Sequence, residues 1–123
     1  MTLIPRMLGA ATAAYGLAAL VRPRILARPV AMVEPDGSLG PAIRVAAGLI
    51  GVRDITVGAA MVLAPAGPPL RTAIVARALF DAGDAVLFGT LSPTPDARRR
   101  SAVVAGGWSA LCALSLLAAR GPR

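Results

Sequence analysis

The chain has 123 residues with a formal net charge of +7, and 56% of its residues are hydrophobic. It contains neither histidine nor lysine, which excludes Ser-His-Asp and Cys-His nucleophiles, imidazole metal sites, Schiff bases and Walker-type phosphate loops. Its single cysteine, Cys112, excludes an intrachain disulfide and a thiolate cluster. Only 15% of the residues are charged, against about a quarter in soluble domains, and the length allows one domain, 1–123.

The basic charge does not indicate a nucleic-acid partner. Aromatic residues make up 3% of the chain, and the thirteen arginines do not follow one amphipathic stripe. Abundant Ala, Gly, Pro and Arg without lysine is typical of a GC-rich bacterial genome. We therefore use the arginines as topology information.

The first apolar stretch covers residues 3–21, about the minimum length for a bilayer span. Arg6 followed by an apolar run also suits a signal peptide. However, the run ends in Val21-Arg22-Pro23 without a small-x-small cleavage site, so we expect a retained span. A linker, 22–41, follows with four prolines, and its apolar residues can lie on the membrane surface.

The second and third apolar stretches, 42–64 and 70–91, are long enough to span but contain charges. They are separated by Pro65-Ala66-Gly67-Pro68-Pro69, which cannot continue a helix. Because this connection is short, we expect the two helices to be antiparallel neighbours.

The fourth stretch, 101–119, contains no charge and follows a polar loop at 92–100. A soluble bundle of this size has no interior large enough to hide such a helix. The sequence therefore predicts an all-α fold, an integral membrane bundle of four transmembrane helices. The linker and the 92–100 loop then share one side, which holds six arginines against four on the other. This difference weakly favours both termini outside the cytoplasm.

Five ionisable residues lie well inside the second and third stretches, where an unpaired charge costs about 2.5–3.5 kcal/mol on insertion scales. They are Arg53, Asp54, Arg77, Asp81 and Asp84. Folding the hairpin about its turn places Arg53 between the depths of Asp81 and Asp84, and Asp54 about one turn from Arg77. The spacing puts Arg77, Asp81 and Asp84 on one helix face.

Small residues form a second pattern in residues 42–64. Gly48, Gly51 and Gly58 share one helix face, which predicts a groove for close helix approach. Arg53 lies nearly opposite this groove, so we expect that Arg53 and Asp54 cannot both point at the third stretch. The ion-pair partners therefore stay open. Tyr15 and Trp108 fall in the middle of their stretches and are expected to pack rather than anchor the interface.

Two segments carry a resemblance to a known family. Gly51-Val52-Arg53-Asp54-Ile55-Thr56-Val57-Gly58 and Arg77-Ala78-Leu79-Phe80-Asp81-Ala82-Gly83-Asp84 resemble marks of an uncharacterised bacterial membrane family, a domain of unknown function. The family is similar in layout to DoxX-like small membrane proteins, and the resemblance covers roughly residues 40–119. It implies a multi-pass protein of the cytoplasmic membrane and brings no catalytic residue or cofactor.

Three functions remain open at this point. The first is a non-enzymatic accessory protein, in which the Arg/Asp network fixes the helices and small-residue faces support a homo-oligomer or a membrane-protein partner. The second is a small transporter or proton/anion pathway through the same residues. The third is a metal-dependent lipid-phosphate enzyme using Asp81 and Asp84, although the further acidic positions of known diphosphate motifs are missing. We expect no catalytic residue, no bound metal and no cofactor, with the lipid bilayer as the main partner.

Overall fold

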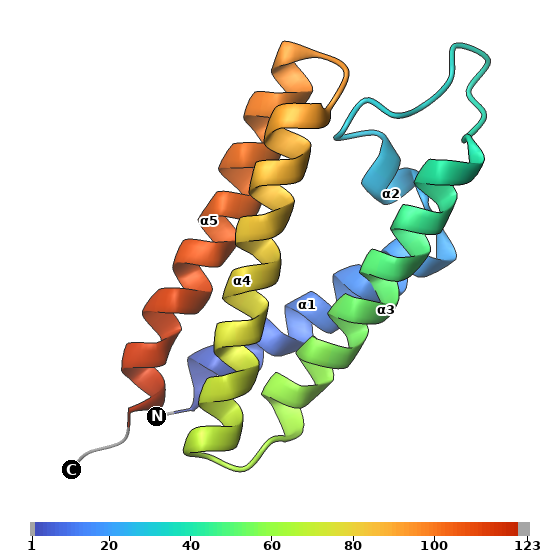
Figure 1. The fold of residues 1–123 in the computed structure, drawn as a ribbon. Helices are drawn as coiled ribbons and strands as arrows, with labels where there is room; N and C mark the ends of the chain where they lie inside the picture. Colours follow the sequence, from blue (N-terminus) through green and yellow to red (C-terminus); the bar gives the residue numbers. More distant parts are fainter. Residues whose placement is uncertain (1, 121–123) are drawn as a thin grey trace.

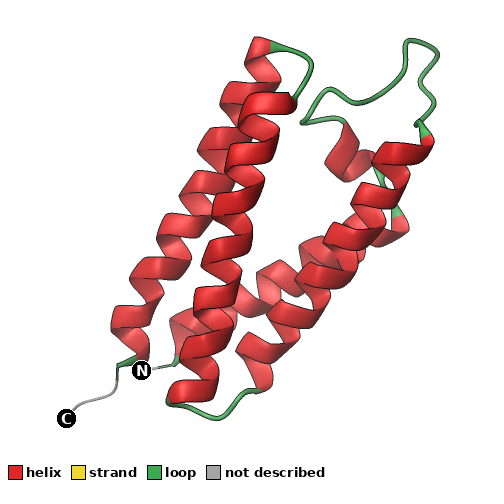
Figure 2. Ribbon diagram, in the orientation of Figure 1, coloured by secondary structure: helices red, strands yellow, loops and turns green. Residues whose placement is uncertain are grey.

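The computed structural model describes residues 2–120 and contains five α-helices, which run as α1 Leu3–Val21, α2 Arg24–Ala27, α3 Pro41–Leu63, α4 Pro68–Leu91 and α5 Pro95–Ala119 (Figure 1). No strand occurs in this part of the chain (Figure 2). The predicted all-α class is therefore confirmed. The four long helices coincide with the four apolar stretches to within a few residues at most ends.

The largest difference in bounds is at the start of α5, which begins at Pro95 rather than at residue 101. The Thr94 hydroxyl accepts a hydrogen bond from the backbone N–H of Ala97 at 3.1 Å, which caps the helix. Pro95 has a fixed φ suited to the first helical position, and Asp96 lies at the positive end of the helix dipole. Most of the expected polar loop at 92–100 therefore belongs to the first turns of α5.

The long helices form two antiparallel pairs, α1 with α3 and α4 with α5 (Figure 1). The two pairs meet near the α3–α4 turn and diverge toward the end that holds α2 and the linker. The expectation that α3 and α4 are close neighbours is thus only partly right. They are antiparallel, but each packs far more extensively against its own partner than against the other.

The linker is folded rather than extended. The short helix α2 and the residues after it place Leu26, Ala27 and Val30 in a core cluster with the start of α3. Further along, the Ser38 hydroxyl and backbone N–H donate to Asp36 Oδ1 at 2.6 and 2.9 Å. These two hydrogen bonds hold the pKa of the exposed Asp36 carboxyl below its ordinary value.

The helices α1, α3 and α5 are long and apolar enough to cross a membrane. Large apolar side chains point outward from them, including Leu49, Leu114 and Leu117, each more than 60% exposed. Exposed apolar surface on this scale is unfavourable in water and favourable against lipid tails. The fold is therefore that of a membrane-embedded protein. Helix α4 is equally long but contains Arg71, and near its middle the three charges of the predicted cluster.

Candidate functional site

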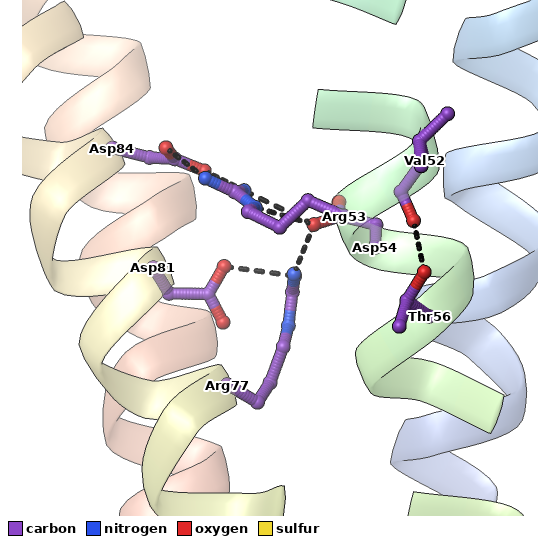
Figure 3. Close-up of polar contacts among 7 residues, drawn as sticks. All are labelled: Val52, Arg53, Asp54, Thr56, Arg77, Asp81 and Asp84. Carbon is purple, nitrogen blue, oxygen red and sulfur yellow. Dashed lines mark hydrogen bonds and ion pairs between the residues drawn. The ribbon is translucent and has the colours of Figure 1, made fainter. Parts of the chain in front are cut away.

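The five predicted ionisable residues meet in one cluster between α3 and α4 (Figure 3). At its centre is Arg77, whose Nη1 lies 2.7 Å from Asp54 Oδ1 and whose Nη2 lies 2.8 Å from Asp81 Oδ1. The first contact joins the two helix pairs, and the second joins neighbouring turns of α4. The sequence placed Asp54 about one helical turn from Arg77 and left the ion-pair partners open, and the structure joins these two side chains.

Arg53 makes the second connection between the helix pairs. Its Nη1 and Nη2 contact the two Asp84 carboxylate oxygens at 3.0 and 2.6 Å, and its Nη2 also contacts Asp54 Oδ1 at 3.0 Å. The guanidinium carbon lies 5.0 Å from the centre of the Phe80 ring, within cation–π range. The expectation that Arg53 and Asp54 cannot both reach the third stretch is wrong, because the long arginine side chain extends around the helix.

The cluster has a dry part and a more accessible part. Asp54, Arg77 and Asp81 are 1%, 4% and 3% exposed, whereas the side chains of Arg53 and Asp84 are 23% and 17% exposed. An uncompensated charge costs most where water is excluded. The Asp54–Arg77–Asp81 triad is therefore the part of the cluster that depends most on its pairing.

The pairing in the whole cluster is incomplete. Three carboxylates share two guanidiniums, and Asp81 Oδ2 and Arg77 Nε find no hydrogen-bond partner among residues 2–120. The buried hydroxyls of Thr12 and Ser101 are also without a partner there. Buried polar atoms normally have partners, so these four atoms mark a place where the fold leaves polar capacity unused.

These unpartnered groups line a cavity of about 350 Å³ between the two helix pairs. Residues from α1, α3, α4, α5 and the linker contribute to its wall. Tyr15, Phe88 and Trp108 supply aromatic surface, so two side chains expected merely to pack also border this cavity. A mostly apolar pocket with a few convergent polar groups is the usual form of a small-molecule site.

A second cavity of about 530 Å³ lies at the linker end of the molecule. Four exposed arginines, Arg22, Arg24, Arg28 and Arg44, line it beside apolar residues of α1 and α2. Arg24 Nη1 donates to the Gly37 carbonyl and Arg44 Nε to the Leu39 carbonyl, so two of these guanidiniums also hold the linker in place. Clusters of arginine at the end of membrane helices attract anionic lipid headgroups.

The glycine groove faces α1 rather than α4. A Cβ at Gly58 would lie 2.5 Å from the Gly9 carbonyl oxygen, and one at Gly51 would lie 2.7 Å from the Gly16 carbonyl oxygen. Nothing lies within 4 Å of a Cβ built at Gly48, so its predicted packing role is wrong. Gly9 and Gly16 were not identified from the sequence. Their spacing equals that of Gly51 and Gly58, and this shared period was the available signal.

Arg6 also has a role that sequence reasoning missed. Its Nη1 donates to the Val62 carbonyl at 2.5 Å and its Nη2 to the Ala64 carbonyl at 3.0 Å. These carbonyls lie at the C-terminal end of α3, where backbone acceptors lack helical partners and the dipole is negative. Arg6 therefore caps α3 from α1. No local sequence pattern predicts such a contact, because the two segments are far apart in sequence.

The geometry does not favour a metal site. Asp81 binds Arg77, whereas Asp84 binds Arg53, so the two carboxylates are committed to different guanidiniums. Among residues 2–120, no group of three or more acidic or cysteine side chains is placed to hold a metal ion.

Comparisons with known proteins add no relative: no protein-family model matches the chain, and neither a curated protein nor a solved structure matches it.

Proposed function

We propose that the chain is a multi-pass protein of the bacterial cytoplasmic membrane in which α1, α3, α4 and α5 all cross the bilayer. It is non-enzymatic in this proposal, an accessory protein whose Arg/Asp cluster locks two helix pairs into one scaffold for a homo-oligomer or a partner membrane protein. The observation that carries it is the pair of cross-contacts, Arg77 to Asp54 and Arg53 to Asp84. The resemblance to DoxX-like small membrane proteins belongs to the same proposal.

Helix α4 is the span that hydropathy alone does not support. The pairing of its charges explains how it can cross the bilayer. Arg77, Asp81 and Asp84 each have a partner of opposite charge, and Arg71 lies one turn from the helix start, where it can reach the interface. Paired charges that face a bundle interior are the ones tolerated inside membranes. The rest of α4 is apolar and packs along α5, which has the properties of a span.

The ionic contacts are best suited to fix the arrangement of the helices. The two pairs also meet through packing, since α1 contacts α5 and since Met61 of α3 shares an apolar cluster with Leu70 and Ile74 of α4. The ionic contacts lie farther from the α3–α4 turn and add a charged link to this packing. Buried ion pairs add little net stability over apolar residues, but they penalise every arrangement that separates the charges.

A pair of variants tests this locking role. Arg53→Leu leaves Asp84 without its cation, whereas Arg53→Leu combined with Asp84→Leu removes both charges. We expect the single variant to lose more free energy of unfolding than the double variant, by about 1–3 kcal/mol, because an isolated carboxylate costs more than an absent pair. Unfolding in mixed micelles by titration with dodecyl sulfate measures the difference. Equal losses would exclude the locking role.

The four-span topology has its own test. In a Cys112→Ala background, single cysteines replace Ser38 in the linker and Gly67 in the α3–α4 turn. We expect them on opposite sides, with Gly67→Cys reacting with an impermeant thiol reagent in intact cells and Ser38→Cys reacting only after permeabilisation. Reaction of both positions from outside would contradict four spans.

The cavity favours a second candidate, a polar pathway through the cluster. Its unpartnered Asp81 oxygen and the hydroxyls around it are the groups that such a route needs. In the same Cys112→Ala background, a cysteine at position 81 or 84 that reacts with the impermeant reagent would show that water reaches the cluster. If both stay silent while a loop cysteine reacts, the cluster is dry and the scaffold proposal stands.

A further inference from the structure

The cavity beside the Arg/Asp cluster concentrates the few aromatic side chains of the chain. The sequence contains one Trp, one Tyr and two Phe. Trp108, Tyr15 and Phe88 line the cavity, and Phe80 lies against Arg53 of the cluster itself. Phe88 and Trp108 also pack against the two apolar core clusters, so they are held in place at the cavity wall. Aromatic faces attract cations, because the ring centre carries partial negative charge.

The Arg/Asp cluster that borders the cavity has a negative excess. The cluster holds three carboxylates against two guanidiniums, and the unpartnered carboxylate oxygen, Asp81 Oδ2, belongs to a residue that is 3% exposed. Thr12, 2% exposed, and Ser101, 9% exposed, present hydroxyls that can accept a hydrogen bond. The cavity therefore combines one unpartnered carboxylate oxygen, hydroxyl acceptors and aromatic walls.

We propose that this cavity binds a small hydrophobic ammonium ion. Its N–H groups donate to Asp81 Oδ2 and to the hydroxyls of Thr12 and Ser101, and its apolar body packs against Trp108. The added positive charge neutralises the cluster inside the membrane. This inference goes beyond the scaffold role. Asp81 belongs to both sites, whereas Thr12, Ser101 and Trp108 line the cavity and take no part in the ion pairs between α3 and α4.

The neighbouring cations do not favour an anionic ligand instead. Arg77 already contacts two carboxylates, and Arg53 contacts Asp54 and Asp84, so both charges are compensated. Arg100 also lines the cavity, but it is exposed and its Nε and Nη2 donate to the Pro29 carbonyl at 3.1 and 2.8 Å. Among residues 2–120, the one unpartnered N–H donor at the cavity is the Arg77 Nε–H. The unpartnered acceptors there are three, namely Asp81 Oδ2 and the hydroxyl oxygens of Thr12 and Ser101.

The test uses the full chain in nanodiscs of phosphatidylcholine, a lipid without net charge, and the fluorescence of Trp108, its single tryptophan. The probes are 2-phenylethylammonium, the neutral 2-phenylethanol and the anionic 3-phenylpropionate. We expect a saturable fluorescence change with the ammonium ion and binding at least about tenfold weaker for the alcohol and the anion. We expect Asp81→Asn to weaken binding of the ammonium ion by at least about tenfold and to leave binding of the alcohol unchanged.

Asp81→Asn keeps an oxygen for the contact with Arg77, and its thermal unfolding in the nanodisc is measured beside the titration. If this variant does not fold, Thr12→Val replaces it, because it removes a cavity hydroxyl without changing any charge. Thr12→Val should weaken binding of the ammonium ion by a few-fold and leave the unfolding temperature unchanged.

The proposal is overturned if folded Asp81→Asn binds the ammonium ion as well as the unaltered chain does. It is also overturned if the alcohol or the anion binds equally well, or if no probe gives a saturable change. A failure here leaves the comparison of the Arg53→Leu variants untouched, so the failure of the binding site and the failure of the scaffold are distinguishable.

Discussion

Helix α3 contacts its two neighbours by opposite means. Toward α1 it presents Gly51 and Gly58, and the two backbones approach so closely that an added Cβ would lie within 3 Å of carbonyl oxygens. Toward α4 it presents Arg53 and Asp54, and long side chains cross a wider gap to charged partners. One helix thus uses shape on one face and charge on the other.

The difference teaches what holds membrane helices together when lipid is as apolar as the side chains. The glycine contact depends on dispersion and close approach, so it responds to added volume and not to charge. The ionic contact depends on compensation, so it responds to the loss of one partner more than to volume. Substitutions on the two faces should therefore fail for different reasons.

The largest effect is expected at the centre of the ionic contact. Arg77→Leu removes the partner shared by Asp54 and Asp81, which are both almost fully buried. We expect a loss of about 3–5 kcal/mol in the free energy of unfolding, measured by dodecyl sulfate titration in mixed micelles. Arg71→Leu, which changes an exposed arginine of the same helix, is the matched control and should change little. A small loss from Arg77→Leu would mean that the triad is not the main link between the pairs.

Added side-chain volume, without any change of charge, should be enough to disrupt the glycine contact between α1 and α3. In Gly58→Ala the new methyl meets the Gly9 carbonyl oxygen at 2.5 Å and the Ala13 backbone nitrogen at 2.7 Å, and backbone cannot move aside cheaply. We expect a loss of about 1–3 kcal/mol in the same unfolding measurement. Gly48→Ala, on the same helix with nothing within 4 Å, should be tolerated. Equal behaviour of the two alanine variants would contradict close packing of α1 on α3.

A smaller loss in the free energy of unfolding is expected at Arg6, which combines features of the glycine contact and of the ionic contact. This residue lies on the α1 side of the glycine contact but acts through charge, by capping the C-terminal carbonyls of α3. Arg6→Leu should cost about 1–2 kcal/mol in the unfolding measurement, because the carbonyls lose charged donors. Arg22→Leu, at the exposed other end of α1, is the control. If both variants unfolded alike, the cap would contribute nothing.

Sequence reasoning identified the members of the ionic cluster but not all of its contacts. Residue depth follows from a rise of 1.5 Å per residue, so Asp54 could be placed within about one helical turn of Arg77 before the structure was known, although the ion-pair partners stayed open. The direction in which Arg53 extends depends on its rotamer and on the position of Asp84, and neither is encoded locally. The free oxygen of Asp81 and the cavity beside it depend on how two helix pairs diverge.

The sequence by itself determined the helical segments, the apolar character of the long helices and the positions of charges within them. These properties are local, because helix propensity, proline breaks and hydropathy act over a few turns. Only the tertiary structure decided that the glycines of α3 face α1, that Arg6 caps α3 and that the cluster opens onto an aromatic cavity. Each of these joins residues distant in sequence, and the choice of partner follows from the fit between whole helix surfaces, which no single segment contains.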